Sequence, residues 1–216
     1  TRPKLIYHLA GSFAGNFETD VLVNAHSSKW IFDALLRSKL DCRVVVFGSA
    51  AEYGMVAEAS NPVAETQALK PVSIYGLTKA MQTQISSYYA SVQGVDVVVA
   101  RVFNLAVKGL SQRLFYGRIV SLVDSYKNRE IDKMTFGNLE AIRDYIELDG
   151  ATAQIIAIAN KGIKGEVYNV GSGIPVRMKD LLCRLLNENG IPLDSFESTP
   201  ENIKLGIDVP MIYADI

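Results

Sequence analysis

Short, mostly apolar runs that alternate with helix-like segments are the feature that most constrains the fold of this chain. The runs lie at Lys4–Leu9, Arg43–Phe47 and Val95–Ala100. Apolar residues on both faces of so short a run are typical of a strand buried in a parallel sheet. Asp20–Leu40 and Leu77–Val92, which separate these runs, are expected to be helices. The alternation predicts an α/β fold built on a doubly wound parallel sheet.

The second half of the chain continues in the same manner. Residues 143–146 are expected to form a strand or a turn. The other expected elements are helices at 117–126, 148–160 and 179–189, and strands at 133–136 and 165–170.

Charge and composition exclude several classes of function. The net charge is −1 over 216 residues, so no basic field would recruit nucleic acid or an anionic membrane. No apolar run is long enough to cross a bilayer. Cys42, Cys183, His8 and His26 form no metal-ligand pattern, and we expect reduced thiols, no metal and a cytoplasmic location. The chain begins at Thr1 and enters a strand almost at once, so we expect it to be the middle of a longer protein.

Tyr75 and Lys79 form the pair with the clearest chemical potential. They lie four residues apart, on one face of the expected helix. Ser73, just after Pro71, is a plausible N-cap, which would place Tyr75 in the first turn. The lysine and the positive end of the helix dipole both favour the phenolate, whose parent phenol has a pKa of about 10. The pair therefore suits proton transfer to a hydroxyl or a ketone.

The same spacing also arises by chance. A chain with this composition holds roughly 0.6 Tyr-x-x-x-Lys pairs at random, and the alternative is an ordinary amphipathic helix. The interpretation therefore depends on context. Ser49 belongs to a polar, glycine-bounded segment, Gly48–Gly54, that follows an expected strand. Ligands of open α/β sheets bind at such strand ends.

Further segments follow in a fixed order along the chain. They are His8-Leu9-Ala10, Asn24, Arg101-Val102-Phe103-Asn104, Arg143-Asp144-Tyr145 and Val167–Gly173. Together with Ser49 and Tyr75-x-x-x-Lys79, they resemble the extended short-chain dehydrogenase/reductase family of sugar-nucleotide epimerases, dehydratases and reductases. The resemblance extends from about Ile6 to Pro210.

The resemblance implies a role for each matching residue. Ser49 would hold a substrate oxygen, Tyr75 would transfer the proton, and Lys79 would lower the pKa of Tyr75. The expected contacts to an NAD or NADP cofactor come from His8, Leu9, Ala10, Tyr75 and Lys79. The expected contacts to a nucleotide-sugar substrate come from Ser49, Asn104 and Arg143.

Each of these assignments has a simpler alternative. Ser49 could only bond a turn, Asn104 could cap a strand end, and His8 could be a core residue. Arg143 could pair with Glu140 or Asp144 on the surface. Asn24 is expected to be structural, and no chemistry is assigned to Glu52.

One departure from the family pattern concerns the dinucleotide. The glycine-rich fingerprint is absent, because Gly11–Gly15 lacks its spacing and follows a different strand. The resemblance then implies a Rossmann-type fold that lacks its first strand–helix units. Residues 1–104 would be the C-terminal part of that domain. Residues 105–216 would be a small substrate-binding region with returns to the sheet near 143–173.

Other segments indicate a subgroup. Phe136–Asp144 resembles GDP-mannose 4,6-dehydratases and GDP-4-keto-6-deoxymannose reductases, while Lys164–Asn169 and Asp208–Pro210 resemble the reductases more closely. Ala51 stands where the resembling dehydratases have a glutamate base. We expect a GDP-4-keto-6-deoxyhexose reductase. The alternatives are a sugar-nucleotide epimerase, a GDP-mannose 4,6-dehydratase, or a non-catalytic member that only binds a nucleotide sugar.

Two helices carry the expected assembly surface. The segments near 24–40 and 77–92 resemble the pair that forms a four-helix homodimer interface in the family. Trp30, Phe32, Tyr88 and Tyr89 would supply aromatic surface of the kind found at interface cores. The alternative is that these side chains pack on the sheet.

Overall fold

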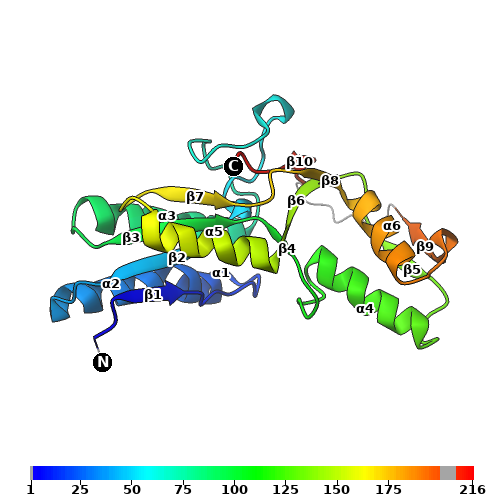
Figure 1. Cartoon of the computed structure of the whole chain (residues 1–216), viewed down its shortest axis with the longest axis horizontal. Coiled ribbons are helices and arrows are strands. Elements are labelled where there is room, and N and C mark those ends of the chain that lie inside the picture. The colour runs from blue at the N-terminus through cyan, green and yellow to red at the C-terminus, as the bar shows by residue number, and fades with distance from the viewer. Residues whose placement is uncertain (1, 200–207) are drawn as a thin grey trace.

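A four-stranded parallel sheet is the centre of the molecule (Figure 1). The structure, a computed structural model, describes residues 2–199 and 208–216. The strands are β1 (Leu5–His8), β2 (Arg43–Ser49), β3 (Val97–Val102) and β7 (Val167–Val170), in the order β1-β2-β3-β7. The expected parallel sheet is confirmed, and Ser49 lies beside Val102 at the carboxyl ends of two adjacent strands.

Helices cover both faces of this sheet because alternate valines point to opposite sides. Val44, Val46, Val97 and Val99 pack with Phe32 and Tyr89 in one apolar cluster. Val45 and Val98 pack on the other face with α5 (Leu148–Lys161). The first layer contains α1 (Phe17–Asp20), a π-helix (Val21–His26), α2 (Ser27–Ser38) and α3 (Ile74–Ser91).

The structure of this layer corrects the prediction that Trp30, Phe32, Tyr88 and Tyr89 all contribute to a dimer surface. Phe32 and Tyr89 are buried against the sheet, because their helix positions face the valine rows. Trp30 and Tyr88 are 53% and 51% exposed. Only part of the expected aromatic surface therefore remains outside the core.

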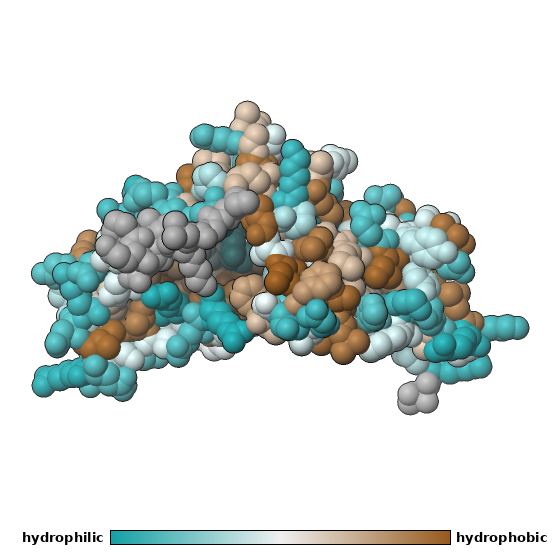
Figure 2. Space-filling view, turned by 180° about the vertical axis from the view of Figure 1, so that it is seen from behind, coloured by the Kyte–Doolittle hydropathy of each residue, from teal (hydrophilic) through white to brown (hydrophobic). Residues whose placement is uncertain are grey.

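A second group of elements lies to the right of the sheet in Figure 1. It contains α4 (Phe115–Lys127), α6 (Met178–Glu188), β5 (Met134–Phe136) and β9 (Phe196–Ser198), which share one apolar core. A further sheet connects the two groups, with β4 (Asn104–Ala106), β6 (Ile142–Glu147), β8 (Pro175–Arg177) and β10 (Met211–Ile212). Short 3₁₀ turns occupy Ala50–Glu52, Glu58–Ser60 and Leu193–Ser195. From behind, the surface is hollowed where the two groups meet (Figure 2).

Most expected elements are present within a few residues of their expected bounds, and Arg143–Ile146 is a strand, part of β6. The segment Asp20–Leu40 is not one continuous α-helix, because a π turn interrupts it at Val21–His26. The strands β4, β8, β9 and β10 were not expected. Among the described helices, none has the length and apolar character needed to span a bilayer.

Candidate functional site

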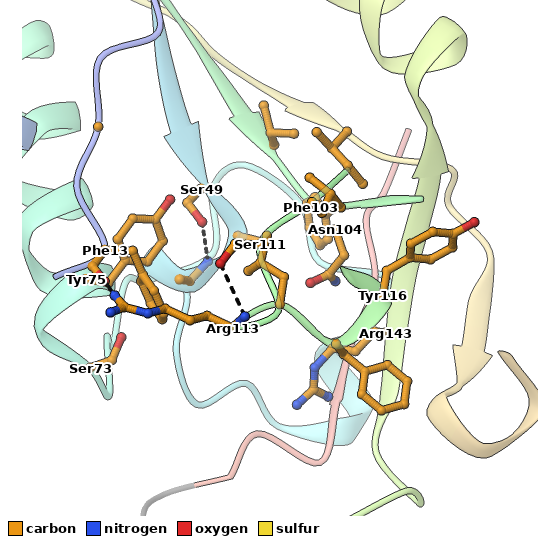
Figure 3. A pocket seen from close by; sticks show the side chains of 18 of the residues that line it. Phe13, Ser49, Ser73, Tyr75, Phe103, Asn104, Ser111, Arg113, Tyr116 and Arg143 are labelled. Carbon is orange, nitrogen blue, oxygen red and sulfur yellow. Dashed lines mark hydrogen bonds between the residues drawn. The ribbon is translucent and has the colours of Figure 1, made fainter. Parts of the chain in front are cut away.

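A cavity of about 880 Å³ lies where the carboxyl ends of β2 and β3 meet the second group of elements (Figure 3). Side chains from both groups line it, including Ser49, Tyr75, Asn104 and Arg143. The structure thus brings four of the expected site residues to one space. Lys79, His8, Leu9 and Ala10 are not among its lining residues.

Ser49 ends β2 and begins a 3₁₀ turn as its N-cap. Its hydroxyl accepts a hydrogen bond from the Ala51 N–H at 3.2 Å, and its own N–H donates to Glu52 Oε1 at 2.8 Å. This reciprocal capping explains why the chain turns sharply after the strand. Ser49 therefore bonds the turn, as the simpler alternative predicted, and it also lines the cavity.

Tyr75 lies in the first turn of α3. Ser73 is the N-cap as expected, and its Oγ accepts the Gly76 N–H at 3.0 Å. Gly76 lets the start of α3 lie against the Ser49 turn, because a Cβ atom there would come within 2.4 Å of the Ala51 carbonyl oxygen. The Phe13 ring meets the Tyr75 ring edge-on, with centroids 4.9 Å apart.

The electrostatics of Tyr75 differ from the expectation. Burial raises the pKa of Tyr75, the Ser49 side chain opposes that shift, and the charges of Glu52 and Asp20 add to it. Lys79 does not lower it here. Its Nζ donates to the Phe47 carbonyl oxygen at 2.6 Å and to Gln82 Oε1 at 2.9 Å. Burial also lowers the pKa of Lys79 to about 8, so its charge is held less firmly than in an exposed lysine.

The end of β1 lies beside Lys79. A Cβ atom on Gly11 would lie 3.5 Å from Asn24 Oδ1 and 3.6 Å from Lys79 Nζ, so the missing side chain leaves room above the lysine. Leu9 is 64% exposed at this edge, whereas His8 is buried with its Nε2 2.9 Å from Ser27 Oγ. Burial and the charge of Lys79 lower the pKa of His8. The edge of the sheet beside Lys79 is therefore open at Leu9 and carries no side chain at Gly11.

Asn24 ties this edge to α3. Its Oδ1 accepts the Ser12 N–H at 2.7 Å, and its Nδ2 donates to Ser12 O and to Thr78 Oγ1. Asn24 is fully buried within the π turn. These contacts agree with the structural role expected for it.

Asn104 and Arg143 face the cavity from β4 and β6. Asn104 Nδ2 donates to the Asp144 carbonyl oxygen at 2.9 Å. Arg143 pairs with Asp208 at 3.3 Å, rather than with Glu140 or Asp144 as the simpler alternative had it, and burial lowers the pKa of its guanidinium. Among the described residues, no cluster of side chains could hold a metal ion.

Several lining residues were not predicted from the sequence as site residues. Phe13, Ser111, Arg113, Tyr116 and Tyr145 all reach the cavity. Arg113 Nη1 donates to the Phe13 carbonyl oxygen at 2.9 Å, which joins two loops beside Tyr75 (Figure 3). Loop residues show no periodicity, and Tyr145 was visible only as part of the Arg143-Asp144-Tyr145 segment.

The chain is similar in sequence to known proteins. The family model described as "NAD dependent epimerase/dehydratase family" matches residues 1–171. GDP-6-deoxy-D-talose 4-dehydrogenase of Aggregatibacter actinomycetemcomitans is 29% identical over 196 residues, which are 86% of this chain and 63% of the relative. dTDP-glucose 4,6-dehydratase of Streptomyces griseus is 26% identical over 82% of this chain and 52% of its own length.

The fold also matches solved structures. RMD from Pseudomonas aeruginosa, solved in complex with NADPH, superposes with a TM-score of 0.90 and 20% identity. The match covers 99% of this chain and 72% of that one. The chain thus spans between about half and two thirds of the length of the two curated relatives.

Proposed function

The chain belongs to the NAD dependent epimerase/dehydratase family, and from this premise we propose that the intact protein reduces the ketone of a GDP-4-keto-6-deoxyhexose with NADH or NADPH. One observation carries the proposal. The cavity has Ser49 and Tyr75 together at its wall, and no aspartate or glutamate is among its described lining residues.

The residues of this chain divide the work of ketone reduction between them. Ser49 donates a hydrogen bond to the ketone oxygen, and Tyr75 gives that oxygen a proton. A bound nicotinamide supplies the hydride. The raised pKa of Tyr75 keeps its phenol protonated at neutral pH, which suits a proton donor. Lys79 and the exposed end of β1 hold the ribose of the nicotinamide.

Two cationic side chains favour a diphosphate substrate. Arg113 and Arg143 both line the cavity, and a guanidinium can bond a phosphate through two N–H groups at once. Asn104 adds a polar side chain to the lining of the same cavity. The name of the 29% identical relative, a GDP-sugar 4-dehydrogenase, supports guanosine and carbon 4 as the nucleotide and the reacting position.

A dehydratase would require further groups. Removal of water from a 4-keto sugar needs a base for one proton and an acid for the departing hydroxyl. Ala51 reaches the cavity at the position of the dehydratase glutamate and has no ionisable group. Glu52, the next residue, is fully buried against Arg101 and does not line the cavity.

Product analysis of the intact protein tests this assignment. With a reduced nicotinamide, it should convert a GDP-4-keto-6-deoxy sugar to the 4-hydroxy product. With GDP-mannose and oxidised nicotinamide, it should form no 4-keto-6-deoxy product. Chromatographic detection of that product would overturn the reductase assignment.

We also propose that the intact protein is a cytoplasmic homodimer. The exposed aromatic residues Trp30 and Tyr88 on α2 and α3 support the dimer. The interface would use the helix layer and leave the cavity free for substrate.

A further inference from the structure

Glu52 is a buried carboxylate that the proposed reaction does not use. It is fully buried one turn beyond Ser49, and a Cβ atom on Gly48 would lie 2.6 Å from its Oε1. The glycine thus leaves the space that the carboxylate fills. A buried charge is costly unless it is paired and hydrogen-bonded, so this placement calls for partners.

The partners of Glu52 come from three different elements. Oε1 accepts the Ser49 N–H at the end of β2, at 2.8 Å. Oε2 accepts from Thr83 on α3 at 2.8 Å and pairs with Arg101 Nη2 on β3 at 3.0 Å. Thr83 lies two turns after Tyr75 on the same helix. One carboxylate therefore connects the Ser49 turn directly to the helix that carries Tyr75.

Arg101, the partner of Glu52, is also buried. It is 2% exposed, and its guanidinium lies over the Tyr53 ring, 4.5 Å from the centroid. Neither Glu52 nor Arg101 lines the cavity. The pair can therefore act on the reaction only through the residues that it holds.

We propose that Glu52 is a positioning residue for the Ser49–Tyr75 pair: its carboxylate, bonded to Ser49 N–H, Thr83 and Arg101, fixes the Ser49 turn against helix α3. The proposal rests on the proposed function for its kinetic consequences. The charge of Glu52 also adds to the raised pKa of Tyr75 and opposes the lowering of the Lys79 pKa by burial. Removal of Glu52 should therefore change pKa values as well as geometry.

The test compares two substitutions in the intact enzyme. Glu52→Gln keeps an acceptor for Ser49 N–H and removes the charge, whereas Glu52→Met removes both. In Glu52→Gln, loss of the negative charge should move the alkaline midpoint of the kcat–pH profile down by about half a unit to one unit. This is the order of the shift that one unit charge produces through a protein interior with an effective dielectric constant of about 20. In Glu52→Met, kcat should also fall by roughly 10- to 100-fold, with little change in KM, because the pair is misplaced.

A second charge pair between the same strands provides a matched control. Arg43 and Asp96 join the amino ends of β2 and β3 at 3.0 Å, away from the cavity. Asp96→Asn should lower the thermal stability and leave the pH midpoint unchanged. An equal shift of the midpoint in Asp96→Asn and Glu52→Gln would overturn the proposal.

Hydrogen exchange supplies a readout that does not depend on turnover. The Ser49 amide should exchange at least about tenfold faster in Glu52→Met than in the wild type or in Glu52→Gln, since an unbonded amide opens freely. Unchanged Ser49 protection in Glu52→Met would overturn the proposal even if the enzyme had a different substrate. Failure of the reductase assay in the wild type would instead count against the proposed function.

If a single variant fails to fold, two double variants still test the proposal. Glu52→Gln with Arg101→Met removes both charges of the pair and keeps the acceptor for Ser49. This double variant should keep kcat within about tenfold of the wild type, because it keeps the acceptor for Ser49 and leaves no unpaired buried charge. Glu52→Met with Arg101→Met lacks the acceptor and should show the larger loss of kcat. Equal kcat in the two double variants would contradict the positioning role.

Discussion

At the scale of the residue, the surroundings of Tyr75 shift its pKa in opposite directions. Burial and two carboxylates raise the pKa of its phenol, while the Ser49 side chain lowers it. A group with a raised pKa stays protonated to higher pH, so it donates a proton readily only where the acceptor becomes strongly basic. The oxygen of a ketone that receives a hydride is such an acceptor, which makes the environment of Tyr75 suited to reduction.

Replacing Tyr75 by Phe removes the proton and keeps the ring that meets Phe13. In the intact enzyme, we expect kcat to fall by about 10²- to 10⁴-fold, the usual scale of general acid catalysis, with little change in substrate affinity. Steady-state kinetics and a substrate-binding titration would measure the two quantities.

Tyr89→Phe on the same helix is the matched control. Its hydroxyl donates to Asp33 and does not reach the cavity. The variant should keep its kcat and lose about 1 kcal/mol of stability, the typical net value of a hydrogen bond. If Tyr75→Phe were as active as Tyr89→Phe, Tyr75 could not be the proton donor.

Some features of single residues could be predicted from the sequence, and others could not. The N-cap at Ser73 was predictable because capping depends on residues within one turn. The pKa of Tyr75 was predicted in the wrong direction, because its burial and the bonds that Lys79 makes to Phe47 and Gln82 both depend on tertiary packing. Glu52 gave no sign of its role for the same reason, since its partner Arg101 is on another strand.

At the scale of the element, the valine runs of β2 and β3 were the most predictable part of the fold. Their apolar residues on both faces fit a sheet covered on both sides. The strands β4, β8 and β10 have two or three residues each, too few to show a period. The π turn was missed because it covers only Val21–His26, too few residues for its spacing to be told from an ordinary helical turn.

The outer face of α2 and α3 leads to a prediction about assembly. Trp30 and Tyr88 are exposed, together with Leu22 and Leu77 of the same layer. The intact protein should sediment as a dimer at tens of micromolar, the range in which a stable homodimer stays associated. Trp30→Lys with Tyr88→Lys should produce a monomer, because two charges would be buried in the interface.

A substitution on the opposite layer tests whether the effect is specific. Ile156 is 47% exposed on α5, which covers the other face of the sheet. Ile156→Lys should leave the dimer intact. Sedimentation of the wild type as a monomer alone would contradict the proposed interface.

At the scale of the whole molecule, the cavity depends on two groups of elements that are distant in sequence. Ser49 and Tyr75 come from the sheet and its helix layer, whereas Arg113 and Tyr116 come from the region of α4. The first set could be predicted because Ser49 follows an expected strand and Tyr75 has the Tyr-x-x-x-Lys spacing on an expected helix. The second set could not be predicted, because only the packing of the two groups brings those loops to the cavity.

At the same scale, the chain offers different binding groups to the two ends of a dinucleotide. The place that we propose for the nicotinamide end is beside Lys79 and Gly11, where a side chain is missing. The pyrophosphate usually binds at a helix N-terminus after a glycine-rich turn, and this sequence of 216 residues contains no such fingerprint. Contacts to the nicotinamide end alone would lack the binding free energy that the pyrophosphate contacts contribute.

We therefore expect the polypeptide of residues 1–216 to bind NADH and NADPH weakly or not at all. Isothermal titration calorimetry with both dinucleotides would measure the affinity, and a cooperative thermal transition of the same sample would establish that the polypeptide is folded. Dissociation constants in the millimolar range or above would agree with the loss of the pyrophosphate contacts, since each tenfold in affinity corresponds to about 1.4 kcal/mol. Micromolar binding by the folded polypeptide would mean that the strand ends and Lys79 hold a dinucleotide without the glycine-rich turn.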